Sequence, residues 1–142
     1  AGQAGERFAV RNSGAISVIE GCDSNGCEYM TGGTVVILGE VGDNFAAGMT
    51  GGMAFVYDPV KEFEKRVNPE TVIWQPLETE YWIKYLKSLI NEHTKETNSL
   101  FSKKIIEKFD LEVKNFVQVC PKEMVEKLKN PLSYGSKFKK VI

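Results

Sequence analysis

A repeat of 19 residues across positions 6–59 constrains the fold of this chain more than any other feature. Gly14, Gly33 and Gly52 stand 19 residues apart, and each precedes a short run with strand character. A second short run recurs with the same period, at 8–11, 27–30 and 46–49. A fixed period of this length, with two strand-like runs per unit, is typical of a β-solenoid.

Equivalent positions of the repeat predict the direction of each side chain. Strand side chains alternate between faces, so wholly apolar columns are expected inside and mixed columns outside. The inward columns are Ile16, Val35 and Ala54; Val18, Ile37 and Val56; Phe8, Cys27 and Ala46; and Val10, Tyr29 and Gly48. The outward columns of the first run are Ala15, Thr34 and Met53; and Ser17, Val36 and Phe55. The glycines before each run predict corners with φ > 0, and Asn25 and Asn44 predict a stacked amide ladder.

The composition changes near Pro59 and predicts two kinds of structure. Residues 1–59 hold 12 of the 13 glycines, no lysine and a charge of −5, from two arginines against seven acids. The remainder holds all 15 lysines and has a charge of +4. We therefore predict β-helix turns over 1–59, an irregular linker over 60–78, and an α-helical segment over 79–142 that packs on the turns.

Local signals place the helices of the second half. Thr79 is a helix cap before residues 80–92, whose apolar stripe includes Trp82 and Tyr85 and is expected to dock on the β-helix. Ser99 caps a second helix. We expect this second helix over 100–109. An extended run is expected at 116–119, followed by a helical turn from Pro121 to about Leu128 and a basic tail over 131–142 that is mobile or bound to a partner.

Charge, hydropathy and cysteine content limit the surroundings of the chain. A net charge of −1 argues against nucleic acid and anionic membranes as partners. No apolar run reaches the roughly 18–20 residues that span a bilayer, and no signal peptide is recognisable. Cys22, Cys27 and Cys120 form no recognised disulfide framework, which favours a reducing cytoplasm.

Each candidate site has a structural interpretation beside the functional one. Cys22 and Cys27 are either metal ligands or small buried residues, and the absence of a partner pair favours burial. The sole histidine, His93, is either a catalytic base or a favourable partner for a helix C-terminus, and we favour the second. The lysine pairs at 103–104 and 139–140 favour a solvated face over a nucleic-acid patch.

The carboxylates offer a rival interpretation of the function. Asp23, Asp43 and Asp58 lie at expected corners but share no column, which favours ordinary turn residues over Ca²⁺ or acid–base sites. If Asp23, Glu28, Glu40 and Asp43 converged in one groove, the chain would instead be an independent carbohydrate-binding or carbohydrate-cleaving β-helix with an acidic cleft.

Three blocks of the sequence resemble the C-terminal glycine-rich domain of the large subunit of glutamate synthase. They are residues 1–15, 26–33 and 44–52. A looser likeness extends through His93, Thr97 and Ser99. Where that family usually has Asp-His, this sequence has Ser24-Asn25.

The resemblance implies a fold and a role. It implies a mainly β structure, a right-handed parallel β-helix of about three 19-residue turns, followed by a small α-helical segment. The parent enzyme converts glutamine and 2-oxoglutarate to two glutamates, with an N-terminal cysteine nucleophile where this chain has Ala1. Its FMN and iron–sulfur cluster are bound in another domain. The implied role is architectural, and we expect no catalytic, cofactor-binding or metal-binding residue in this chain.

The start of the sequence also predicts a partner. Residues 1–5 match the corner and loop of a preceding turn, so we expect a C-terminal piece of a longer protein, or a second chain that covers this end. The expected partners are the remaining domains of glutamate synthase, or a further copy joined through residues 1–14 as a homo-oligomer.

Overall fold

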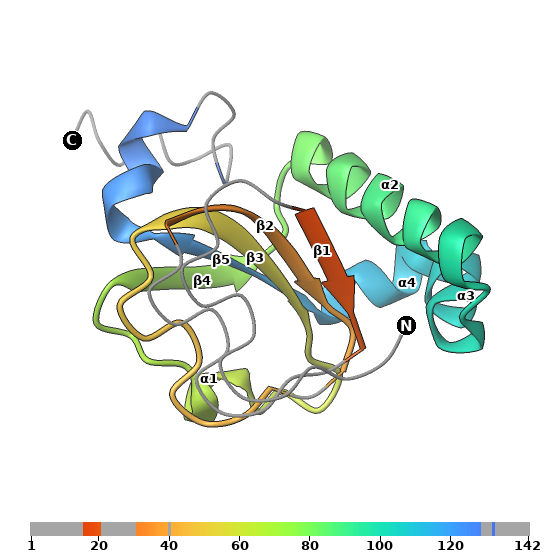
Figure 1. The fold of residues 1–142 in the computed structure, drawn as a ribbon, viewed down its shortest axis with the longest axis horizontal. Coiled ribbons are helices and arrows are strands. Elements are labelled where there is room, and N and C mark those ends of the chain that lie inside the picture. Colours follow the sequence, from red (N-terminus) through yellow and green to blue (C-terminus); the bar gives the residue numbers. More distant parts are fainter. Residues whose placement is uncertain (1–15, 21–30, 40, 129–131, 133–142) are drawn as a thin grey trace.

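The computed structural model describes residues 16–20, 31–39, 41–128 and 132, and its strands form one sheet (Figure 1). The strands run in the order β1-β2-β3-β5-β4. Their bounds are β1 (Ile16–Ile19), β2 (Thr31–Ile37), β3 (Gly51–Tyr57), β4 (Val72–Pro76) and β5 (Phe116–Pro121). The pairs β1–β2 and β2–β3 are parallel, whereas β3–β5 and β5–β4 are antiparallel.

The helices lie mainly in the second half of the chain. They are α1 (Phe63–Arg66), α2 (Glu80–Thr97), α3 (Leu100–Glu107) and α4 (Phe109–Glu112), with 3-10 turns η1 (Val113–Asn115) and η2 (Lys122–Lys127). Both predicted caps are confirmed, because the Thr79 side chain accepts from the Trp82 N–H and the Ser99 side chain from the Ser102 N–H. Helix α2 continues to Thr97, beyond the predicted end, and Asn98 stops it with φ 54°.

The predicted parallel β-helix is wrong. The described residues form a single mixed sheet flanked by helices, and two of its strands, β4 and β5, come from the half without the repeat. Residues 46–49, predicted as a strand, form turns, and the only pairing nearby in the described chain is the isolated bridge of Phe45 with Val67. Residues 60–78, predicted as an irregular linker, contain α1 and β4. A period identifies equivalent positions, but it does not fix how many sheets those positions build.

The strand register follows the period in one pair and departs from it in the other. Val35 pairs with Ala54, 19 residues on, as predicted. Ile16 pairs with Thr34, only 18 residues on. A slip of one residue turns every side chain of a strand to the other face. Val18, predicted to point inward with Ile37, therefore packs on the opposite face.

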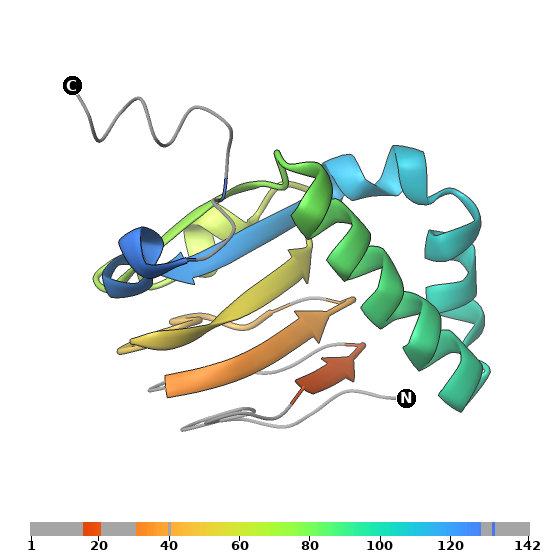
Figure 2. The same cartoon turned by 90° about the horizontal axis from the view of Figure 1, so that it is seen from above.

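Both faces of the sheet are buried. One face packs against the connection after β2, with Phe45 and Met49 fully buried beside Val35 and Ala54. The other face packs against α2, which crosses beside β1, β2 and β3 in Figure 2. Helix α2 buries Val36, Met53 and Phe55, so the prediction that these columns face outward is wrong. Parallel strands are usually covered on both faces, and these follow that rule.

Gly33 and Gly52 have the predicted positive φ, but they do not lie at corners between strands. Gly33 has φ 81° and Gly52 has φ 85°. Both lie inside strands, and the β2–β3 register shifts between Thr31 and Thr34. The positive φ therefore makes a bulge within the sheet where we predicted a corner between strands. Gly14 and Asn25 lie outside the described residues.

No helix in the described part of the chain is both long enough and apolar enough to cross a membrane.

Candidate functional site

The aromatic stripe of α2 docks on the sheet, as predicted from Trp82 and Tyr85. The rings of both residues lie 6.2 Å from the ring of Phe55 in β3. Tyr85 also places its hydroxyl 3.2 Å from Thr34 Oγ1 in β2. This contact fixes α2 across the parallel strands and brings its C-terminal half alongside β1.

That docking brings a carboxylate, an imidazole and a hydroxyl together. Glu20 directly follows β1, His93 lies in α2, and Ser99 is the N-cap of α3. Ser99 Oγ donates to Glu20 Oε2 at 2.7 Å, and His93 Nε2 lies 3.5 Å from the same oxygen. The His93 side chain is 7% exposed and that of Glu20 is 21% exposed. We call these three residues the Glu20 cluster.

The geometry of the Glu20 cluster differs from that of a catalytic triad. A serine nucleophile needs its hydroxyl within hydrogen-bond reach of the base. Here the Ser99 hydroxyl donates to the carboxylate and accepts from the Ser102 N–H at 3.2 Å. One oxygen of Glu20 thus joins the end of β1 to both α2 and α3, over sequence separations of 73 and 79 residues.

Neighbouring hydroxyls hold the end of α2 in place around the cluster. Thr97 Oγ1 donates to the His93 carbonyl at 2.8 Å. Thr94 Oγ1 donates to the Ile90 carbonyl at 2.9 Å and lies 2.8 Å from Ser102 Oγ. His93 lies buried beside Glu20, about one turn before α2 ends at Thr97, and its role as a partner for the helix C-terminus stays a prediction. No local pattern in the sequence pointed to Glu20.

A cavity of about 460 Å³ opens between α2 and β1 next to His93. Ile16 and Val18 line it from the strand, and Leu89 lines it from the helix. Within the described residues β1 pairs only with β2, and Ile16 is 59% exposed. Among the described residues, β1 is therefore the last strand of the sheet and presents exposed apolar surface there.

Asp43 and Asp58 are the predicted acidic residues that the structure describes, and each has a polar partner. Asp43 lies 3.6 Å from the Arg66 guanidinium. Both oxygens of Asp58 accept backbone N–H groups at the start of α1, from Glu62 at 3.0 Å and Phe63 at 3.1 Å. The described residues contain no group of three or more His, Cys, Asp or Glu side chains that could hold a metal ion. Asp23, Glu28 and Glu40 lie outside the described residues.

The described cysteine does not fit an iron–sulfur ligand. Cys120 is fully buried in β5, and burial raises the pKa of its thiol to about 12. Cluster ligands are thiolates, which this environment disfavours. Cys22 and Cys27 lie outside the described residues, as does the lysine pair at 139–140, whereas Lys103 and Lys104 are exposed on α3.

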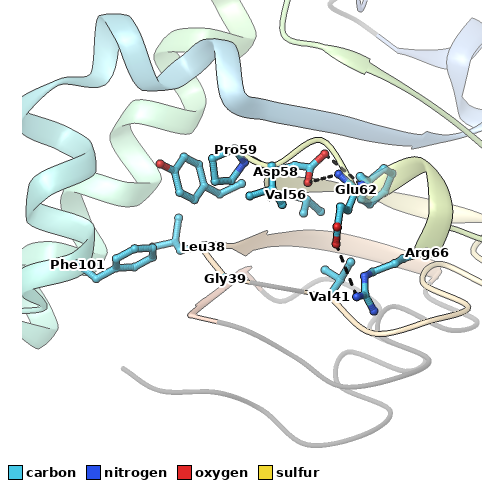
Figure 3. Close-up of a pocket in the computed structure, with 12 residues that line it drawn as sticks. Leu38, Gly39, Val41, Val56, Asp58, Pro59, Glu62, Arg66 and Phe101 are labelled. Carbon is cyan, nitrogen blue, oxygen red and sulfur yellow. Dashed lines mark hydrogen bonds and ion pairs between the residues drawn. The ribbon is translucent and has the colours of Figure 1, made fainter.

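A second cavity, of about 350 Å³, lies at the ends of β2 and β3 (Figure 3). We call it the strand-end pocket. Its walls come from Leu38, which follows β2, from Val56 in β3, from Phe63 in α1, and from Phe101 in α3. Among its described lining residues the cation is Arg66, which lies 3.8 Å from Glu62 as well as near Asp43. A guanidinium already paired with two carboxylates is poorly suited to a flavin phosphate, so the pocket does not fit FMN.

The half-buried Tyr57 joins the end of β3 to α4 and η1. The Tyr57 hydroxyl donates to Glu112 Oε2 at 2.7 Å, and Asn115 Nδ2 donates to Glu112 Oε1 at 3.0 Å. Burial and the Glu112 carboxylate raise the pKa of Tyr57 to about 12. This contact ties β3 to α4 and η1.

Comparison with known proteins gives one consistent result. A family model described as the GXGXG motif matches residues 1–122. The glutamate synthase [NADPH] large chain of Azospirillum brasilense is 60% identical over 132 residues, which is 93% of this chain and 9% of that protein. The corresponding large chain of Bacillus subtilis is 48% identical over 128 residues, 89% of this chain and 8% of that protein. The glutamate synthase [NADH] of Schizosaccharomyces pombe is 49% identical over 122 residues, 86% of this chain and 6% of that protein.

The chain thus spans less than a tenth of the length of these relatives. The resemblance of its glycine-rich blocks to the glutamate synthase large subunit is confirmed. Because the family model matches most of its residues, this chain belongs to the GXGXG-motif family.

Proposed function

We propose that this chain is a structural and interaction module of glutamate synthase, without catalytic residues of its own. In this proposal it packs against the amidotransferase and synthase domains and maintains their separation. The parent reaction converts glutamine and 2-oxoglutarate to two glutamates, in ammonia assimilation. In this proposal, FMN and the iron–sulfur cluster of glutamate synthase are bound outside this chain. The complete enzyme is cytoplasmic.

The Glu20 cluster carries the proposal. In this cluster, a carboxylate, the sole histidine and a hydroxyl lie together. These are the groups that acid–base or nucleophilic chemistry needs. Each of the three is engaged in holding β1 against the helices, and Ser99 is also a helix cap. The cluster therefore serves the fold.

The strand edge supports an interaction role. Apolar Ile16 is largely exposed on β1, beside the cavity that β1 forms with α2. Exposed strand edges bind further strands unless they are covered. We propose that the remaining domains of glutamate synthase cover this edge, with self-association of the chain as the alternative.

The test is an activity assay on the purified 142-residue chain. We expect neither glutaminase activity nor glutamate formation when glutamine, 2-oxoglutarate and a reductant are supplied, with a complete glutamate synthase as the positive control. Turnover above background that survives further purification would overturn the proposal. Cleavage or binding of a carbohydrate would favour the rival interpretation.

A further inference from the structure

The strand-end pocket combines a buried apolar floor with an exposed apolar mouth. On the floor, Leu38, Val56 and Phe63 are 0%, 2% and 2% exposed. At the mouth, Val60 and Phe101 are 67% and 41% exposed. Figure 3 shows Phe101 and Leu38 on one side of the depression and Arg66 on the other. Exposed apolar side chains at the mouth of an apolar pocket give a partner's apolar side chain a surface on which to pack.

The size of the pocket limits what it can receive. A volume of about 350 Å³ is at the lower end of the roughly 300–1,000 Å³ found for small-ligand sites. Polar side chains on its lining are already engaged. The Asp58 carboxylate accepts the backbone N–H groups of Glu62 and Phe63, and Arg66 lies between Glu62 and Asp43. The pocket therefore offers few free groups to orient a polar ligand, and it suits one large apolar side chain.

The charge around the pocket indicates the chemistry beside that side chain. Of the described lining residues, Asp58 and Glu62 are acidic and Arg66 is basic, and a further carboxylate, that of Asp43, lies 3.6 Å from Arg66. The rim is therefore acidic overall. A basic residue next to the inserted side chain would complement it.

We infer that the strand-end pocket receives a large apolar side chain, flanked by a lysine or arginine, from a segment of the glutamate synthase large chain outside these 142 residues. This inference rests on the proposed function. In the relatives the matching region is only 6–9% of the protein, so over nine-tenths of the polypeptide is a potential partner. A tethered partner has a high effective concentration, so a small pocket is sufficient.

Site-specific photo-cross-linking in the complete large chain tests the inference. Phe101 is replaced by a benzophenone-bearing phenylalanine, and the matched control carries it at Tyr81, an aromatic residue of α2 that is 49% exposed and does not line the pocket. We expect an intramolecular cross-link from position 101 to a peptide outside residues 1–142, beside a lysine or arginine, at least tenfold stronger than from position 81. A cross-link within residues 1–142, a cross-link to a second copy, equal yields at the two positions, or no cross-link would each overturn it.

A second variant separates docking from folding. Val60→Lys removes apolar surface at the mouth and places there a cation that repels the basic flanking residue, so it should lower the cross-link yield at least fivefold, whereas Val60→Ile should retain it. Because Val60 is largely exposed, neither change should move the urea midpoint of the 142-residue chain. An unchanged yield in Val60→Lys would overturn the inference. If only this inference fails, the cross-link is lost but the isolated 142-residue chain still shows no turnover. If the proposed function fails, the isolated chain shows turnover.

Discussion

A double-mutant cycle on Glu20 and Ser99 should show strong coupling between them. Their hydrogen bond is 2.7 Å long and involves a carboxylate that is 21% exposed. Hydrogen bonds to charged groups contribute about 1.5–3 kcal/mol. Glu20→Ala should therefore cost about 2 kcal/mol. Ser99→Ala also removes a helix cap worth about 1 kcal/mol, so it should cost about 3 kcal/mol.

The double variant should cost clearly less than the sum of the two single changes. The second substitution removes a bond that the first has already broken, so we expect a coupling energy of at least about 1 kcal/mol. Urea unfolding followed by the fluorescence of Trp74 and Trp82 measures it. With a slope of about 2 kcal/mol/M, a loss of about 2 kcal/mol lowers the midpoint by about 1 M. The matched control Glu96→Ala, an exposed carboxylate on the same helix as His93, should change stability by less than about 0.5 kcal/mol.

Additive effects within about 0.3–0.5 kcal/mol would refute this reasoning. They would mean that the carboxylate and the hydroxyl stabilise the fold independently, and that β1 is not held to α2 and α3 through Glu20.

Three further predictions follow from the buried groups. Phe55→Ala, which empties the fully buried seam between β3 and α2, should cost about 3–5 kcal/mol in urea unfolding, whereas Leu111→Ala, 65% exposed, should cost less than about 0.5 kcal/mol. The pKa of Tyr57 is raised from 10.0 to about 12, so the contribution of its protonated hydroxyl to stability is present below pH 10 and lost as the pH rises towards 12. Tyr57→Phe should flatten this alkaline loss of stability in urea unfolding at a series of pH values, and an unchanged slope would contradict the prediction. Burial raises the pKa of Cys120 from 9.0 to about 12, so its thiol should react with a thiol reagent at pH 8 at least about 100-fold more slowly in the folded chain than in urea. The rates are measured with Cys22 and Cys27 replaced by Ser, and equal rates would show that β5 is accessible.

Local signals in the sequence were sufficient for the helix starts and the aromatic seam. Thr79 and Ser99 act through hydrogen bonds to residues three positions away, so the sequence alone reveals them. Trp82 and Tyr85 lie at helical spacing, which identified the docking face of α2. The period likewise gave the β2–β3 register, because Val35 and Ala54 are neighbours in parallel strands.

The remainder of the fold depends on tertiary contacts that no local pattern reports. Val36 and Phe55 occupied mixed columns and were predicted to face outward, yet α2 covers that face. Strand β4 ends at Pro76, which resembled a loop signal, but proline is tolerated in an edge strand. The one-residue shift of β1 also came from pairing, and it reversed the predicted direction of Val18.

The same reason explains what was missed in the candidate site. His93 was considered only with its own helix, because its partner Glu20 is 73 residues away in the sequence. Packing of α2 beside β1 creates the contact. The prediction that Asp58 is a turn residue needed only the adjacent start of α1, and the structure places both carboxylate oxygens on backbone N–H groups there.

The most direct test of the structural role is the turnover of a complete glutamate synthase that carries His93→Gln in this segment. We expect the turnover rate per folded enzyme to stay within about twofold of the unsubstituted enzyme, because general acid–base residues contribute about 10²–10⁴-fold and the proposed function gives His93 no such role. The urea midpoint of the 142-residue chain should fall, since His93 packs against Glu20 in the interior. Turnover that drops by about two orders of magnitude or more, while the urea midpoint stays unchanged, would contradict the account.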